Sequence, residues 1–261
     1  MATRMGYLTN KVRSLLGSRD TPWPVILGDT NRAFHGDRCY QQLVLSICSQ
    51  WPISSFVETG TYVGDTTEYM ARTFSFPIYS CEVKDAYFHS SSKRLKGFSH
   101  VKMIHASSEQ ALRQIIDQNL VGPLPLFYLD AHWYDYWPLV DEIGLIVSRV
   151  PRCVVVIDDF QVPGSSDFTF CEGGGGSPEF SGRATVDKRI CNLELIRGKL
   201  CQPAEYRLLH PRYSRQEAFG VSSSENLIGY VVLFRNLVPE LPALTKQQFI
   251  NDHFECVNLD R

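Results

Sequence analysis

The chain lacks several features that would place it in a special class. Its apolar runs are shorter than the 18 or more residues of a membrane-spanning helix, and residues 1–17 contain no apolar core long enough for a secretory signal. Its lysines and arginines form no run, and its eight cysteines show no Cys-x-x-Cys spacing. With a net charge of −2, these absences predict a cytoplasmic protein with reduced thiols that binds neither a membrane nor a nucleic acid.

What the chain does contain is a series of short apolar segments, most of which end in an acidic residue. Continuous apolar runs of this kind suit parallel strands that are covered on both faces. With 261 residues and 44% hydrophobic content, the chain can bury one large core. We therefore predict an α/β fold with a doubly wound, mostly parallel, seven-stranded sheet and an antiparallel edge. The expected strands end or lie at residues 56–58, 77–83, 100–106, 124–130, 153–160, 204–210 and 226–234, with helices at 37–50 and 183–199.

The turn after the first strand is the most informative motif. Glu58 ends the strand, Gly60 and Gly64 allow a tight turn, and residues 65–67 can cap the following helix. The glycine spacing differs from the Gly-x-Gly-x-x-Gly of dinucleotide folds, and a carboxylate stands where a pyrophosphate would bind. A carboxylate there suits a ligand that carries an ammonium and a sulfonium, such as S-adenosylmethionine. The alternative is a purely structural turn.

Other acidic residues follow the neighbouring strands. Glu82 ends the second strand, where a parallel nucleotide-binding fold places an acid that accepts from both ribose hydroxyls. Ser107 begins a cap-like sequence after the third strand and is a candidate neighbour of an adenine. Because ligands of parallel sheets bind at the carboxyl ends of the strands, we expect five acids to line one rim. They are Glu58, Glu82, Asp130, Asp158 and Asp159.

Three motifs in this order resemble a known family. Glu58-Thr-Gly-Thr-Tyr-Val-Gly64, Leu129-Asp-Ala-His-Trp133 and Ile157-Asp-Asp-Phe-Gln-Val-Pro-Gly164 are similar to motifs of the class I S-adenosylmethionine-dependent methyltransferases, most closely the metal-dependent O-methyltransferases of the catechol type. The resemblance covers residues 56–164 and implies a Rossmann-like methyltransferase fold. It implies that His132 touches the cofactor and that Trp133 stacks on its adenine. The expected cofactor-binding set is Glu58, Gly60, Thr61, Tyr62, Gly64, Glu82, Ser107, Asp130, His132 and Trp133.

The same resemblance implies that Asp130, Asp158 and Asp159 hold a divalent cation. Three carboxylates without clustered cysteine or histidine form the hard oxygen site that Mg²⁺ prefers, and a bound Mg²⁺ could be chelated by a diol. The alternative is that the Asp158-Asp159 pair only caps a loop. The family places a lysine base just after the tryptophan, where this chain has Tyr134. We therefore assign the catalytic role to His132 first and Tyr134 second, with Asp130 beside them.

The rest of the chain is interpreted more coarsely. Residues 1–35 are predicted to be an N-terminal extension or lid, and residues 36–261 the cofactor-binding domain, with a flexible Gly-rich loop or linker at 171–182. His35 is interpreted as a surface or core residue, like four other histidines. The predicted function is methyl transfer from S-adenosylmethionine to a hydroxyl of a small molecule. The alternatives are another metal-assisted reaction on the same fold and a non-catalytic scaffold that binds the cofactor, and a homodimer is one option for assembly.

Overall fold

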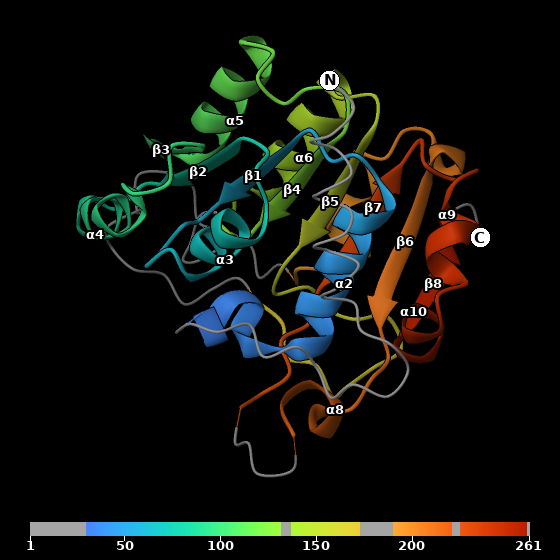
Figure 1. Cartoon of the computed structure of the whole chain (residues 1–261). Helices are drawn as coiled ribbons and strands as arrows, with labels where there is room; N and C mark the ends of the chain where they lie inside the picture. The colour runs from blue at the N-terminus through green and yellow to red at the C-terminus, as the bar shows by residue number, and fades with distance from the viewer. Residues whose placement is uncertain (1–29, 132–136, 173–189, 221–224, 260–261) are drawn as a thin grey trace, which may run out of the picture.

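The computed structural model describes residues 30–131, 137–172, 190–220 and 225–259. Within them, helices cover both faces of one sheet whose strand order is β3-β2-β1-β4-β5-β7-β6-β8 (Figure 1). Strands β3, β2, β1, β4 and β5 are parallel, whereas β7, β6 and β8 each run antiparallel to their neighbour. The predicted Rossmann-like, doubly wound and mostly parallel sheet is confirmed. Its strands are β1 (Ser55–Thr59), β2 (Ile78–Glu82), β3 (Val101–His105), β4 (Pro125–Leu129), β5 (Cys153–Ile157), β6 (Tyr206–Pro211), β7 (Val231–Arg235) and β8 (Phe254–Asn258).

The described sheet has eight strands rather than the seven predicted, and the additional one is β8 at the edge. Its five residues pair with β6, and only Phe254 among them is buried. A short strand with one buried side chain gives little periodic signal, which explains why the sequence did not reveal it. The predicted antiparallel pair, β6 and β7, is present, but β8 rather than this pair forms the edge.

The helices begin and end close to the predicted places in the first half of the chain. Asp37 caps the helix predicted at 37–50, and its carboxylate accepts from the amide of Tyr40 at 3.0 Å. The described helices are η1 (Thr30–Gly36), α2 (Arg38–Gln50), α3 (Asp65–Thr73), α4 (Asp85–Leu95), α5 (Ser108–Asp117), α6 (Leu139–Arg149), α7 (Leu193–Arg197), η3 (Pro203–Glu205), α8 (Arg215–Phe219), α9 (Leu241–Thr245) and α10 (Gln248–His253).

Two expectations about helix ends were wrong. The helix predicted at 183–199 is short in its described part, because Asn192 caps α7 and Ile190 before it bridges to Glu172. Residues 183–189 lie outside the described residues. The helix after the first turn is not capped by residues 65–67, since its N-cap is Gly64 with a φ of +87° and no side chain makes a cap bond. Thr67 instead faces inward, toward Glu58.

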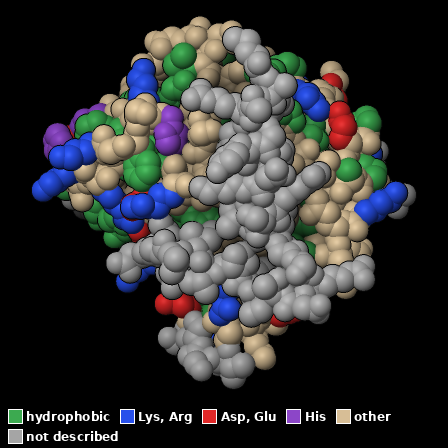
Figure 2. Space-filling view, in the orientation of Figure 1, with side chains coloured by type: hydrophobic (Ala, Val, Ile, Leu, Met, Phe, Trp, Pro, Cys, Tyr) green, Lys and Arg blue, Asp and Glu red, His purple; other side chains and the backbone are tan. Residues whose placement is uncertain are grey.

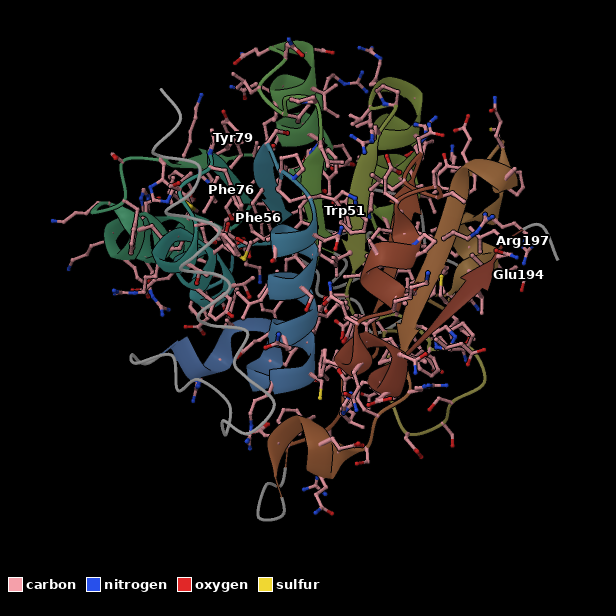
Figure 3. All side chains as sticks on the ribbon, turned by 45° about the vertical axis from the view of Figure 1, so that its right-hand side comes forward. Trp51, Phe56, Phe76, Tyr79, Glu194 and Arg197 are labelled. Carbon is pink, nitrogen blue, oxygen red and sulfur yellow. The ribbon has the colours of Figure 1, made fainter. Side chains whose placement is uncertain are left out.

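A hydrophobic core lies on each face of the sheet. On one face, α2 and α3 pack over the strands, and α2 crosses the near side in Figure 1. Trp51, just after α2, packs its ring 5.5 Å from that of Phe234 in β7, and Phe56 of β1 belongs to the same core (Figure 3). On the other face, α5 and α6 bury their apolar sides against the sheet. Burying both faces fixes the strands and therefore the rim at their carboxyl ends.

The segment η1 lies across that rim. In Figure 1 it sits below the sheet, at the end toward which the arrows of β4 and β5 point. Phe34, His35 and Gly36 all have positive φ, at 52°, 60° and 74°, so the chain coils tightly here. This coil buries Phe34 against Tyr40 and Tyr128, with ring centroids 5.0 and 5.4 Å apart. The end of the predicted N-terminal extension is thus packed into the same core.

No helix in the described part of the chain is long and apolar enough to span a lipid bilayer. All eight cysteines fall within the described residues, and no disulfide joins them there. Figure 2 shows lysine and arginine side chains scattered over the visible face, rather than gathered over one element.

Candidate active site

A cavity of about 760 Å³ opens at the carboxyl ends of the parallel strands. This size falls within the range of pockets that bind small molecules and cofactors. The turn after β1, the end of β4 and the segment η1 all contribute to it. Among the lining residues are Glu58, Gly60, Thr61, Tyr62, Tyr128 and Asp130 from the sheet side, and Arg32, His35 and Arg38 from the other side.

The turn after β1 is held tightly against its neighbouring strands. The amides of Gly60 and Thr61 both donate to the carbonyl of Cys81 in β2, at 3.0 Å each. Gly60 has a φ of +83°, and a Cβ on it would lie 2.4 Å from the carbonyl oxygen of Asp130. Gly60 is therefore required for the close approach of two strand ends, in addition to any approach of a ligand.

Glu58 is buried beneath this turn. Its carboxylate accepts from the hydroxyls of Thr67 in α3 and Ser80 in β2. Burial raises the pKa of Glu58 to about 7, although both hydroxyl bonds oppose the change. Glu58 also lines the cavity. A cationic group of a ligand in the cavity would therefore favour the ionised form of Glu58.

Glu82 lies next to the cavity and shapes its wall. Its two oxygens accept from the amides of Tyr62 and Lys84, each at 2.8 Å. Each carboxylate oxygen can accept a further bond, so Glu82 keeps the capacity to bind hydroxyls. Tyr62 is 55% exposed and its ring meets that of Tyr87 edge-on at 4.6 Å.

Gly64 and Ser107 lie at helix starts rather than among the residues that line the cavity. Gly64 is the N-cap of α3, where a positive φ is needed. Ser107 is the N-cap of α5, but its side chain makes no cap hydrogen bond. Their predicted contacts with a cofactor stay predictions.

Asp158 is the centre of a second acidic group. It is fully buried at the end of β5 and accepts from His35 Nε2 at 2.5 Å and from the Tyr128 hydroxyl at 3.0 Å on Oδ2. The hydroxyl of Tyr40 in α2 lies 3.4 Å from Oδ1. Side chains from η1, α2 and β4 therefore converge on one carboxylate.

Asp130 and Asp159 complete the acid cluster, which we define as Asp130, Asp158 and Asp159. Burial and then the neighbouring Asp158 raise the pKa of Asp130 well above its ordinary value. The same two causes raise the pKa of Asp159 to about 7. Oδ1 of Asp130 is buried and has no hydrogen-bond partner within the described residues. Three carboxylates this close repel one another, so the cluster favours a nearby cation.

His35 supplies a positive charge beside the acid cluster. Burial alone would lower the pKa of His35, but the charges of Asp158, Asp130 and Asp159 raise it to about 10. The imidazole is therefore protonated at neutral pH. Its side chain is 31% exposed and lines the cavity.

The sequence interpretation of His35, a surface or satisfied core residue with no visible partner, did not reveal that it bonds Asp158 at the cavity. No motif surrounds it, and only the coiled backbone of η1 places it at the rim. Tyr128 could have been found, because it precedes Asp130 by two residues and side chains in a strand alternate between faces. Three predicted residues, His132, Trp133 and Tyr134, lie outside the described residues.

No protein-family model matches the sequence, and none of the curated proteins matches it. Among solved structures, the chain is similar to the O-methyltransferase TomG from Streptomyces achromogenes, involved in tomaymycin synthesis, in complex with S-adenosylmethionine, with 13% identity, 90% of each chain covered and a TM-score of 0.49. An O-methyltransferase from Bacillus cereus in complex with S-adenosylhomocysteine is 14% identical, with 88% of this chain and 90% of that chain covered and a TM-score of 0.49.

An rRNA methylase from Streptococcus thermophilus is also similar, at 16% identity and a TM-score of 0.44 over 76% of this chain and 97% of that chain. With identities of 13 to 16% and TM-scores of 0.44 to 0.49, these likenesses are too weak to assign a substrate or an activity. What the site can do rests on its own residues.

Proposed function

We propose that the chain is an S-adenosylmethionine-dependent O-methyltransferase that acts on a hydroxyl of a small molecule. The observation that carries this proposal is the shared cavity, in which Glu58 and Asp130 meet at the carboxyl ends of β1 and β4. Buried acids of this kind attract a ligand with an ammonium and a sulfonium. A cavity of about 760 Å³ has room for such a cofactor and a small acceptor.

The chemistry of the lining residues fits the parts of this cofactor. Glu58 and Asp130 match its ammonium and sulfonium, and Arg32 and Arg38 line the same cavity and match its carboxylate. Glu82, which accepts from the amide of Tyr62, matches the ribose hydroxyls. When bound, the cofactor would supply an electrophilic methyl group. The chain would then hold the acceptor oxygen in line and remove its proton.

The residue that removes this proton is expected outside the described part of the chain. His132 and Tyr134 stay the predicted bases, and Asp130 lines the cavity next to them in sequence. Tyr128 and Tyr40 donate toward Asp158, and burial raises the pKa of both hydroxyls well above its ordinary value, so neither supplies a phenolate base. Their contribution is to hold the buried carboxylate in place.

The predicted magnesium site fits the described side chains poorly. Among the described residues, no group of three or more His, Cys, Asp or Glu has the spacing of a metal centre. Oδ2 of Asp158 already accepts from His35 and Tyr128. The acid cluster has the oxygen ligands that Mg²⁺ prefers, but the imidazole of His35 already bonds its central carboxylate. We therefore route no step of the reaction through a metal.

Calorimetric titration with S-adenosylmethionine and S-adenosylhomocysteine tests the cofactor. We expect saturable binding by the wild type and about tenfold weaker binding by Glu82→Gln, which loses charge at the ribose position. Glu240→Gln is the matched control, because Glu240 lies outside the cavity lining and pairs with Arg152, with side chains 45% and 38% exposed. No binding of either compound would contradict the proposal.

Transfer of a radiolabelled methyl group to a panel of phenols, catechols and sugars tests the reaction itself. Labelled product that is lost in a Glu58→Ala variant would support methyl transfer to oxygen. Cofactor binding without transfer to any hydroxyl compound would favour the non-catalytic scaffold.

A further inference from the structure

Two arginines line the cavity without a partner among the described residues. Arg32 and Arg38 are both exposed, and neither makes an ion pair or a hydrogen bond there. Arg94, by contrast, is paired with Asp65 and Glu68 of α3. An unpaired guanidinium offers a planar set of donors to an anion. S-adenosylmethionine has one carboxylate, so one of the two arginines is left for another anionic group.

Arg32 belongs to a segment that packs beside the turn after β1. It lies in η1, where the amide of Phe34 donates to Thr66 Oγ1 at 3.3 Å. The ring of Phe34 also meets that of Tyr69 edge-on, with centroids 5.7 Å apart. Thr66 and Tyr69 are both in α3, the helix that follows the turn. Arg32 therefore lies on the side of the cavity that is expected to hold the cofactor.

Arg38 reaches toward a different wall of the cavity. It is the first residue of α2, and its Nη2 lies so close to Gly220 that a Cβ there would be 3.0 Å away. Gly220 ends α8 with a φ of +85°, and α8 lies below α2 in Figure 1, away from α3. The guanidinium of Arg38 is therefore placed at the wall that α8 contributes.

The side chains beside Arg38 give this wall a half-buried apolar surface. Phe219 of α8 and Ile228 both line the cavity and are half-buried. Glu225 and Asn226 line it too, but no ion pair joins Glu225 to Arg38 in the part of the chain that the structure describes. An apolar surface next to an unpaired guanidinium suits a ligand with a flat apolar body and a carboxylate.

We propose that the methyl acceptor is a small hydroxy acid with an apolar body, such as an aromatic ring, and that its carboxylate pairs with Arg38. This inference rests on the proposed function and adds the charge of the acceptor to it. The acceptor hydroxyl oxygen gains the methyl group, the methyl–sulfur bond of the cofactor breaks, and the hydroxyl proton passes to the base. The carboxylate is unchanged, because its pair with Arg38 orients the acceptor and keeps the carboxylate away from the sulfonium.

Calorimetric titration with protocatechuate, salicylate and their neutral amides tests this inference. We expect the wild type to bind at least one of the acids about tenfold more tightly than its amide, and Arg38→Met to reduce that preference to about threefold or less. Arg38→Lys keeps the charge and should restore part of the preference. Arg215→Met is the matched control, because Arg215 is also exposed and is the first residue of α8, but it does not line the cavity.

Arg32→Met separates the roles of the two arginines. We expect this variant to bind S-adenosylmethionine more weakly and to keep the preference for the acid. Three results would overturn the inference. The wild type could bind acids and amides equally or bind none of them, Arg38→Met could keep the full preference, or Arg32→Met rather than Arg38→Met could lose it.

The chemical form of the labelled product gives a second readout. Methyl transfer to the hydroxyl of protocatechuate yields an ether that is stable in alkali, which would support the inference. An alkali-labile methyl ester would overturn it, because the carboxylate would then face the sulfonium rather than Arg38.

Titrating the acids with and without S-adenosylhomocysteine keeps the two proposals apart. A wild type that binds no S-adenosylmethionine would overturn the proposed function, whatever the acids do. A wild type that binds the cofactor but shows no preference for the acids would overturn only the pairing with Arg38.

Discussion

Glu58 and Asp158 are two buried acids at the same rim of the sheet, and they are stabilised in different ways. Glu58 accepts from Thr67 and Ser80, which are neutral hydroxyls 9 and 22 positions away. Asp158 accepts from His35, 123 positions away, which carries a charge. Neutral hydroxyls close in sequence leave Glu58 able to take up a proton. A cation that is far away in sequence but adjacent in space holds Asp158 in an ion pair. The two acids should therefore respond differently to substitution and to pH.

The largest effect is expected for Asp158→Asn. The free energy of unfolding should fall by about 3 kcal/mol, because His35 loses its partner and its charge stays in a largely buried place. The value lies at the lower end of the range for buried pairs, since the His35 side chain is 31% exposed and repulsion with Asp130 is relieved. Urea denaturation measures the change, and methyl transfer should be lost with it.

Asp117→Asn is the control for this substitution. Asp117 pairs with Arg149 at 2.9 Å, but both side chains are about half exposed, so the loss should stay below about 1 kcal/mol. Equal losses for the two variants would mean that the His35 pair is no stronger than a surface ion pair.

The same comparison shows what the sequence could and could not predict. Glu58, Gly60 and the acids after β4 and β5 end or follow continuous apolar runs, so their place at the carboxyl ends of parallel strands predicted one rim. Asp158's partners could not be found in this way, because His35 and Tyr40 reach it only through the packing of η1 and α2 against the sheet. Periodicity reports which face a side chain occupies, but it does not report which distant segment covers that face.

The pH dependence of the free energy of unfolding should report on Glu58. The pKa of Glu58 is about 7 in the folded protein and 4.5 in its ordinary state. Between these values the folded protein binds more protons than the unfolded chain, so the free energy of unfolding should fall as pH rises from about 4.5 to 7. The steepest slope for one such group is about 1.4 kcal/mol per pH unit.

Urea denaturation from pH 5 to 8 measures this slope in the wild type and in Glu58→Gln. Glu142 of α6 is also buried, with a pKa raised to about 7 by that burial, so it contributes in the same window. Glu58→Gln should therefore reduce the slope without removing it, and Glu142→Gln should do the same. An unchanged slope in Glu58→Gln would show that Glu58 is ionised in the folded protein throughout this range.

Gly60→Ala tests the tight turn after β1, which follows Glu58 and lies against Asp130. A φ of +83° and a Cβ placed 2.4 Å from the Asp130 carbonyl oxygen should lower the free energy of unfolding by about 2 kcal/mol and weaken cofactor binding. Gly97→Ala is the matched control, since a Cβ there meets nothing within 4 Å. Thermal denaturation measures the stability of both variants, and calorimetric titration measures their affinity for the cofactor. Similar results for Gly60→Ala and Gly97→Ala would show that the strand ends can move apart.

The smallest effect is expected at the hydroxyls that hold Glu58. Thr67→Val keeps the shape of the side chain but removes the donor to the buried carboxylate, so the free energy of unfolding should fall by about 1 kcal/mol. Ser80 still donates to the same carboxylate, which keeps the loss small. Thr67→Ser retains the hydroxyl and should lose less than Thr67→Val, as urea denaturation at pH 8 can show. If Thr67→Val kept the stability of the wild type while Thr67→Ser lost some, the contribution of Thr67 would come from its methyl group, and Glu58 would depend on Ser80 alone.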